Sequence, residues 1–128
     1  MIDHIGFAVR DFEASRAFYD KVFAPLGYAL LMQVTAEMTG GSQHAGYGAN
    51  GRAQFWIGTG PSIGGPVHIA FEADSRDKVD AFHAAALMAG GRDNGAPGLR
   101  TVYHPNYYGA YVFDPDGNNI EAVCHKPA

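Results

Sequence analysis

The chain has 128 residues, of which 47% are hydrophobic and 17% charged, a balance typical of one globular domain. Its net charge of −4 and the scattered positions of Lys and Arg argue against a nucleic-acid partner or an anionic membrane surface. No apolar segment has the length of a membrane span, and the single cysteine provides no disulfide within the chain, so we expect a cytoplasmic protein.

The first half of the chain predicts one helix among several short strands. Residues 2–9 form an apolar run typical of a strand, and Asp11 is a suitable cap for the helix that follows. Residues 28–34 and 53–57 predict two further strands. The glycine-rich stretch 39–48 predicts a mobile loop that runs into a weak strand.

The second half predicts a similar order of elements. Residues 58–66 lack apolar periodicity and predict a linker, after which residues 67–73 predict a strand. A helix is expected over residues 75–89, because two glycines follow its last apolar residues. Residues 92–102 predict a glycine-broken connection with no more than a short strand.

The chain ends in a predicted hairpin. Residues 114–117, Asp-Pro-Asp-Gly, have type I turn chemistry, so they join antiparallel strands over 107–113 and 118–124. Glu121 is then a carboxylate in the middle of an apolar strand. A buried carboxylate needs a cation, a hydrogen-bond donor or solvent. The alternative is a surface glutamate on a half-exposed strand.

The two halves also share sequence, which indicates an internal duplication. A shift of 64 residues aligns His-Ile-Gly-Phe at 4–7 with His-Ile-Ala-Phe at 68–71. Each half therefore presents a histidine, His4 or His68, at the same point of its first strand. A single histidine on an apolar strand is usually a hydrogen-bonded core residue, but two equivalent ones would converge on a pseudo-twofold axis. With Glu121 they match the ligand chemistry of a divalent transition metal, although the spacing alone does not establish this.

The chain resembles the vicinal oxygen chelate superfamily, which includes glyoxalases, fosfomycin-inactivating enzymes, extradiol dioxygenases and bleomycin-binding proteins. The resemblance rests on four segments, DHIGFAV at 3–9, RAFYDKVFAPLGY at 16–28, HIAF at 68–71 and DPDGNNIE at 114–121. It implies a single α+β domain over residues 1–128. Within it, two βαβββ modules, about 1–60 and 66–128, would form an incomplete mixed-sheet barrel around a metal.

The resemblance also implies the metal ligands. His4, His68 and Glu121 match three of the family's ligand positions, and such a site admits one divalent ion, Fe2+, Zn2+, Ni2+ or Mn2+. Glyoxalases of the superfamily use a fourth protein ligand. Counting from Gly51, the position equivalent to Glu121 is Phe55, which cannot ligate. We therefore expect three ligands and open positions for substrate.

A second resemblance concerns the extradiol dioxygenases. His104, Tyr111, the turn at 114–117 and Glu121 stand in the order found in those enzymes, with Ala110 where they prefer a larger apolar residue. This implies that Tyr111 and His104 hydrogen-bond and shuttle protons near a metal-bound oxygen. The alternative is that Tyr111 packs in a strand and His104 is a loop residue.

These features predict a metal-dependent enzyme that binds a small substrate through vicinal oxygens, with lyase, isomerase or extradiol dioxygenase-like chemistry. Phe55 and Trp56 are the expected substrate contacts for a flat or apolar molecule. The alternative is a metal-free, drug-sequestering protein of the bleomycin-resistance type, and a vestigial site is a third. Retention of all three ligands favours the enzyme. The resemblance also implies a homodimer, in which His4 and His68 come from one chain or from two.

Overall fold

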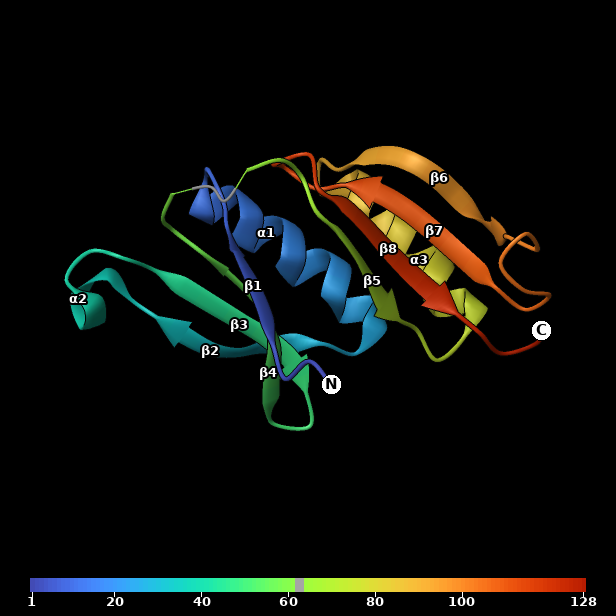
Figure 1. Ribbon diagram of the computed structural model, residues 1–128, viewed down its shortest axis with the longest axis horizontal. Coiled ribbons are helices and arrows are strands. Elements are labelled where there is room, and N and C mark those ends of the chain that lie inside the picture. Colours follow the sequence, from blue (N-terminus) through green and yellow to red (C-terminus); the bar gives the residue numbers. More distant parts are fainter. Residues whose placement is uncertain (62–63) are drawn as a thin grey trace.

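The computed structural model describes residues 1–61 and 64–128, and two modules repeat the same order of elements (Figure 1). The first module contains β1 (Ile5–Ala8), α1 (Phe12–Phe23), the 3-10 helix η1 (Ala24–Leu26), β2 (Ala29–Val34), α2 (Ala36–Thr39), β3 (His44–Ala49) and β4 (Arg52–Gly58). The second contains β5 (His68–Glu72), α3 (Arg76–Met88), β6 (Arg92–Leu99), β7 (Tyr108–Phe113) and β8 (Asn119–Cys124). The predicted linker at 58–66 includes residues 62 and 63, which lie outside the described residues.

Each module builds one four-stranded mixed sheet. The strand orders are β1-β4-β3-β2 and β5-β8-β7-β6, with the first strand of each module parallel to the last and the other pairs antiparallel. Over the described residues the two sheets stay separate and do not close into a barrel. The predicted α+β fold of two βαβββ modules with an incomplete barrel is therefore confirmed.

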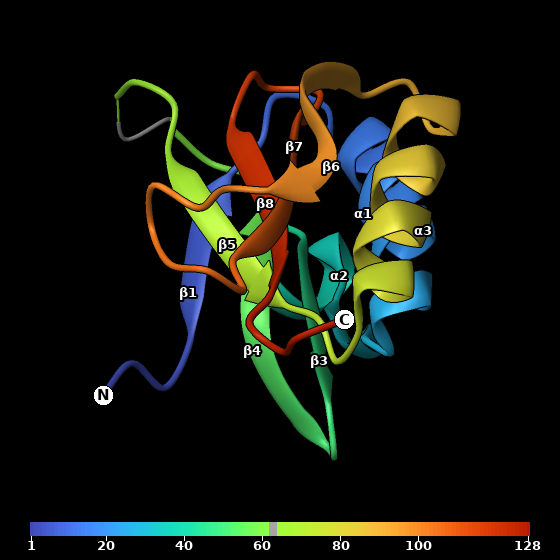
Figure 2. The same cartoon turned by 90° about the vertical axis from the view of Figure 1, so that its right-hand side faces the viewer.

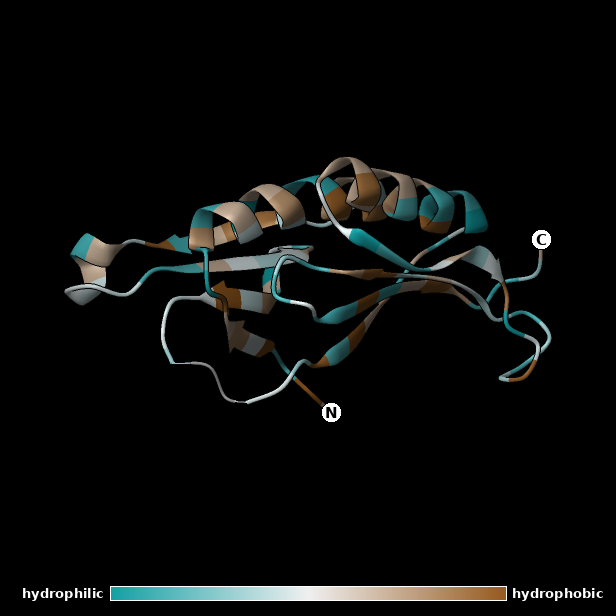
Figure 3. Cartoon of the chain, turned by 90° about the horizontal axis from the view of Figure 1, so that it is seen from above, coloured by the Kyte–Doolittle hydropathy of each residue, from teal (hydrophilic) through white to brown (hydrophobic). Residues whose placement is uncertain are grey.

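The two long helices cover the same side of both sheets (Figure 3). They also lie side by side, which joins the modules (Figure 2). α1 begins where the Asp11 carboxylate accepts a hydrogen bond from the Ala14 backbone N at 3.0 Å, as expected of a cap. α3 begins in the same way, at Ser75. The opposite side of each sheet is left without a helix.

A cluster of aromatic rings fills the seam between the modules. Phe23 of α1 and Phe55 of β4 both pack edge-on against Phe71 of β5, with ring centroids 4.9 and 5.2 Å apart. Tyr19 and Tyr47 complete the cluster against Phe23 and Phe55. The hydrophobic core therefore draws its side chains from both halves of the chain.

The stretch 39–48 differs from its prediction. Instead of a loop and a weak strand, it holds the end of α2 and most of β3, an inner strand whose residues 45–48 are all buried. Its glycines serve close packing: a Cβ at Gly46 would lie 2.7 Å from the Trp56 ring, and one at Gly48 would lie 1.8 Å from the Arg52 carbonyl oxygen. Residues 92–99 likewise form an eight-residue strand, β6, with register irregularities at Gly95 and Gly98.

The predicted turn at 114–117 is present. The Gly117 backbone N donates to the Asp114 carbonyl oxygen at 3.0 Å, and Gly117 has a φ of 84°. The buried Asp114 carboxylate accepts hydrogen bonds from Asn118 and from the Tyr19 hydroxyl of α1, the latter at 2.7 Å. The turn of the second module is thereby attached to the helix of the first.

Among the helices of the described residues, none combines the length and the apolar character needed to cross a membrane.

Candidate metal centre

Glu121 lies near the middle of β8, on the side of the sheet that faces away from α3. Strand alternation directs its neighbours Ile120 and Ala122 into the hydrophobic core and Glu121 to the opposite side. The residue is nevertheless only 1% exposed, because side chains from β5 and from the segment before β7 cover it. The surface glutamate considered as an alternative is therefore ruled out.

The two carboxylate oxygens of Glu121 have different partners. Oε1 accepts a hydrogen bond from the Tyr107 hydroxyl. Oε2 lies 3.1 Å from Nε2 of His68, whose side chain is 50% exposed. The pair therefore has one side held within the protein and one side open to solvent, as a site that takes up a ligand requires.

The protonation of His68 follows from its second hydrogen bond. Its Nδ1 lies 3.0 Å from the carbonyl oxygen of Asn119, and a carbonyl can only accept, so Nδ1 carries a proton. In the neutral ring Nε2 then presents a lone pair to Glu121 Oε2, which also has only lone pairs. A proton or a cation between these two atoms makes the contact favourable.

His4 has a similar arrangement in the other sheet. Its Nδ1 donates to the Asp3 carboxylate at 2.8 Å, which leaves Nε2 as the free nitrogen, and Arg52 binds the same carboxylate at 3.1 Å. The hydrogen bond from His4 is the main cause that lowers the pKa of Asp3. A metal-binding histidine commonly has its other ring nitrogen held in this way.

The chain brings two of the three predicted ligands together and leaves the third apart. His68 and Glu121 lie on adjacent strands of the second sheet, whereas His4 precedes the edge strand β1 of the first. Within residues 1–61 and 64–128, no three side chains of His, Cys, Asp or Glu form a group that could hold a metal ion. The described part of one chain therefore brings together two of the three predicted ligands.

Tyr111 lies beside the His68–Glu121 pair. It is directly opposite Glu121 in the β7–β8 register, and its ring stacks with that of His68 at a centroid distance of 6.4 Å. The Arg100 guanidinium lies over the same ring, 5.4 Å from its centroid. Burial and the charge of Glu121 raise the pKa of Tyr111, so its hydroxyl keeps its proton.

His104 contacts Tyr107, which links it to this cluster. Its Nδ1 accepts from the Asn106 backbone N at 3.0 Å, so Nε2 carries the proton and donates to Nδ1 of His125 at 2.7 Å. The ring also packs edge-on against Tyr107, at 5.5 Å. Sequence reasoning did not single out Tyr107, because its approach to Glu121 depends on the fold of the loop before β7.

The strand register corrects one predicted equivalence. Ala70 pairs with Glu121 in the second module, and Gly6 pairs with Trp56 in the first, so Trp56 rather than Phe55 occupies the corresponding position. The count from Gly51 was displaced by one residue because the β3–β4 register shifts between Tyr47 and Gly48, which leaves Gln54 as an extra residue in β4 before Trp56. Since Trp cannot ligate either, the expected lack of a fourth ligand is unchanged.

The two predicted substrate contacts have different surroundings. Phe55 belongs to the core and is 3% exposed, with its ring 4.9 Å from that of Tyr19. Trp56 is half-buried, lies over Gly46, and donates from Nε1 to the Ala53 carbonyl oxygen at 3.3 Å. Substrate contact by either side chain stays a prediction.

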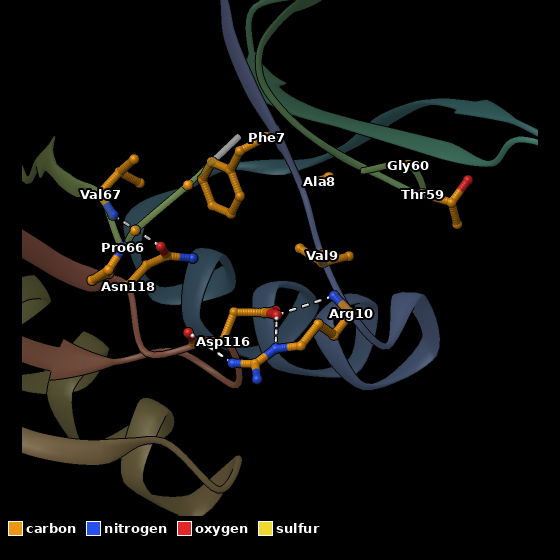
Figure 4. Close-up of a pocket in the computed structure, with 12 residues that line it drawn as sticks. Phe7, Ala8, Val9, Arg10, Thr59, Gly60, Pro66, Val67, Asp116 and Asn118 are labelled. Atoms are coloured by element: carbon orange, nitrogen blue, oxygen red, sulfur yellow. Dashed lines mark hydrogen bonds and ion pairs between the residues drawn. The ribbon is translucent and has the colours of Figure 1, made fainter. Parts of the chain in front are cut away.

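A cavity of about 540 Å³ lies elsewhere, where the end of β1, residues 59–60 and 64–67, and the turn of the second module meet (Figure 4). Phe7, Val9 and Asn118 line it, and Arg10 binds Asp116 across it with an Nε–Oδ1 distance of 3.0 Å. None of the predicted ligands lines this cavity. Its two charged side chains neutralise each other, so we assign it no role in catalysis.

The chain combines paired βαβββ modules with a histidine and a glutamate on adjacent strands. Comparison with known sequences identifies the class of protein that has this arrangement. A sequence model of the Glyoxalase/Bleomycin resistance protein/Dioxygenase superfamily matches residues 1–122. The chain belongs to this superfamily, as the resemblance implied. None of the curated proteins with which the chain was compared matches it.

Solved structures agree with this assignment. A glyoxalase/bleomycin resistance protein from Albidiferax ferrireducens T118 is 32% identical over 98% of both chains, with a TM-score of 0.74. A mutant of the fosfomycin resistance protein FosX from Listeria monocytogenes, complexed with Mn(II) and 1S,2S-dihydroxypropylphosphonic acid, is 20% identical over 96% of this chain and 90% of its own, with a TM-score of 0.70. A mutant of glyoxalase I from Zea mays is 23% identical over 95% of this chain and 45% of its own, with a TM-score of 0.69. The last two show the shared fold alone.

Proposed function

We propose that this protein is a metal-dependent enzyme that binds a small substrate through two adjacent oxygens on one divalent ion. His68 and Glu121 of one chain and His4 of a second copy would hold that ion. The observation that carries the proposal is the 3.1 Å approach of two lone-pair atoms, His68 Nε2 and Glu121 Oε2, on a solvent-accessible side of the sheet. Two imidazoles and one carboxylate suit Fe2+, Zn2+, Ni2+ or Mn2+, and FosX from Listeria monocytogenes was solved with Mn(II).

Such an ion, when bound, acts as a Lewis acid that stabilises negative charge developing on a substrate oxygen. The chain's own residues add hydrogen bonds and shape. Tyr111, which retains its proton, is placed to donate a hydrogen bond to a substrate oxygen beside His68. Trp56 offers a flat apolar surface on the other sheet. Lyase, isomerase and dioxygenase chemistry all remain compatible with these groups.

A homodimer is part of the proposal. His4 and His68 each have Nδ1 committed to a hydrogen bond, but they lie in different sheets of one chain. A second copy that brings its first sheet to the second sheet of this one would complete the ligand set. The exposed side chains of Ile2 and Ile5, next to His4, would gain burial there. A cytoplasmic location stays a prediction, supported by the single cysteine.

Elemental analysis tests the metal proposal. Protein purified without chelator or histidine tag should contain about one divalent ion per chain, and His68→Ala should contain almost none. His44→Ala, which removes a histidine from β3, is the matched control and should retain the metal. Wild-type protein that is metal-free and takes up none of the four ions on titration would refute the proposal.

A metal-free binding protein is the second candidate. A cavity of about 220 Å³ between the modules is lined by aromatic side chains that include Tyr28, Tyr47 and Phe71, which suits an apolar ligand. This candidate is supported if the wild-type protein takes up no metal but binds flat aromatic compounds, followed by quenching of the single tryptophan.

A further inference from the structure

We propose that Tyr107 is a positioning residue for the metal site: its hydroxyl fixes the Glu121 carboxylate so that Oε2 stays directed at Nε2 of His68. The inference rests on the proposed metal-dependent function and deepens it, because it assigns a role to a residue outside the ligand set. A ligand carboxylate that is held by an outer hydrogen bond does not have to be oriented when the ion binds.

The hydrogen bond has a defined direction. An ionised carboxylate can only accept, so the Tyr107 hydroxyl donates to Glu121 Oε1. With Oε1 engaged, Oε2 is the oxygen left for His68 and for an ion. One carboxylate oxygen therefore accepts from the tyrosine, and the other faces the histidine.

Gly109 provides the space in which these groups meet. A Cβ at this position would lie 3.1 Å from Glu121 Oε1, 3.2 Å from Tyr107 Cε1 and 3.6 Å from the Tyr111 hydroxyl. Gly109 is not among the glycines with positive φ, so its backbone does not require glycine. The absence of a side chain is needed for the approach of the tyrosine to the carboxylate.

Tyr107 is itself held firmly before it makes this contact. Its backbone N donates to the His104 carbonyl oxygen at 3.1 Å, and its own carbonyl oxygen accepts from the Arg100 backbone N at 2.7 Å. Its ring packs against those of Tyr103, His104 and His125, with centroids 4.9 to 5.5 Å away. Little side-chain freedom therefore remains to be lost when the hydroxyl orients Glu121.

The test is the affinity for Mn2+ measured by calorimetric titration of the protein, with Tyr107→Phe compared to wild type. Removal of the hydroxyl frees Glu121 to rotate, so the Kd should rise by about 10- to 100-fold. Tyr103→Phe is the matched control, because it removes a hydroxyl from the adjacent ring and leaves the Tyr107–Glu121 contact in place. Its Kd should equal that of the wild type.

A second variant tests the same contact from the other side. Gly109→Ala keeps the Tyr107 hydroxyl but places a methyl group against Glu121 Oε1, so it too should weaken Mn2+ binding. Circular dichroism and melting curves establish that each variant is folded. A Kd within twofold of wild type in both folded variants would overturn the role of Tyr107 and leave the metal proposal standing. A wild-type protein that binds no Mn2+, Fe2+, Zn2+ or Ni2+ would instead overturn the metal proposal itself.

Discussion

At the scale of single residues, the burial of Glu121 is the feature that requires explanation. A carboxylate that is 1% exposed would be costly without partners, and Tyr107 satisfies one of its oxygens. The other oxygen faces a histidine nitrogen whose ring already holds its proton on the far side. The pair can therefore serve either as a structural ion pair that shares a proton or as two ligands of a cation.

Glu121→Gln distinguishes these two roles. The glutamine oxygen can accept from Tyr107 and its amide group can donate to His68, so the chelator-treated variant should be at least as stable as the chelator-treated wild type. Added Mn2+ should raise the melting temperature of the wild type by several degrees and leave the variant unchanged, because binding stabilises only the protein that has the site. Thermal melts with and without Mn2+ provide the measurement.

A large loss of stability in the chelator-treated Glu121→Gln protein would contradict this view. It would mean that the His68–Glu121 contact is a structural ion pair that contributes to the stability of the fold.

At the scale of elements, the turn at 114–117 connects the modules as well as the strands β7 and β8. Its Asp114 carboxylate is buried and accepts from the Tyr19 hydroxyl of α1 at 2.7 Å. Burial and the charge of Asp114 raise the pKa of Tyr19 well above its usual range. The stability linked to this tyrosine is therefore complete below the unfolded-state pKa of about 10 and is lost as the pH rises beyond it.

Tyr19→Phe should lower the free energy of unfolding by about 1 to 3 kcal/mol at pH 7, because a hydrogen bond to a buried charged group is lost. The difference between wild type and variant should shrink between about pH 9 and pH 11. Urea unfolding at a series of pH values measures both effects. A difference that grows with pH in this range would mean that the tyrosinate is favoured in the folded state.

Local sequence patterns predicted an element correctly where neighbouring residues determine its conformation. The alternation around Glu121 and the residues of the 114–117 turn gave the final hairpin correctly. They failed where contacts with distant residues determine the structure. The glycines of β3 suggested a loop, although Gly46 lies in a strand under the Trp56 ring. The equivalence of Phe55 to Glu121 failed for a related reason, since the extra residue in β4, Gln54, depends on how that strand pairs with β3.

Gly46→Ala tests the packing role of this glycine. A Cβ there would lie 2.7 Å from the Trp56 ring, so the indole must move, and we expect a loss of about 1 to 3 kcal/mol together with a shift in tryptophan fluorescence. Gly65→Ala is the control, since a Cβ there meets nothing within 4 Å and should change neither quantity. Equal behaviour of the two variants would show that Gly46 is not required for space. Trp56 is the single tryptophan, so its emission reports on this site alone.

At the scale of the whole molecule, the two modules share one hydrophobic core but keep their candidate ligands apart. His68 and Glu121 could be identified from sequence, and the fold places them in contact. The separation of His4 from the His68–Glu121 pair could not be predicted. It depends on how the two sheets pack, which the internal repeat does not determine. Tyr107 was missed because no sequence pattern shows where a loop side chain will point.

A dimer that completes the site makes metal binding depend on protein concentration. Light scattering after gel filtration should give twice the 13.7 kDa mass of the chain. Dilution below the dimer dissociation constant should release the ion, because each separated chain brings only two of its three proposed ligands together. A monomer that binds metal as tightly as the concentrated protein would show that one chain contains the complete site.

The most direct test of a ligand set shared between two chains is metal binding by mixed dimers. His4→Ala and His68→Ala chains should each bind almost no Mn2+ alone. Co-expressed chains should recover about a quarter of the wild-type metal per chain, because half of the randomly formed dimers are mixed and each of these has one intact site. No recovery in the mixture, or wild-type binding by His4→Ala alone, would contradict the proposal that His4 of one chain joins His68 and Glu121 of the other.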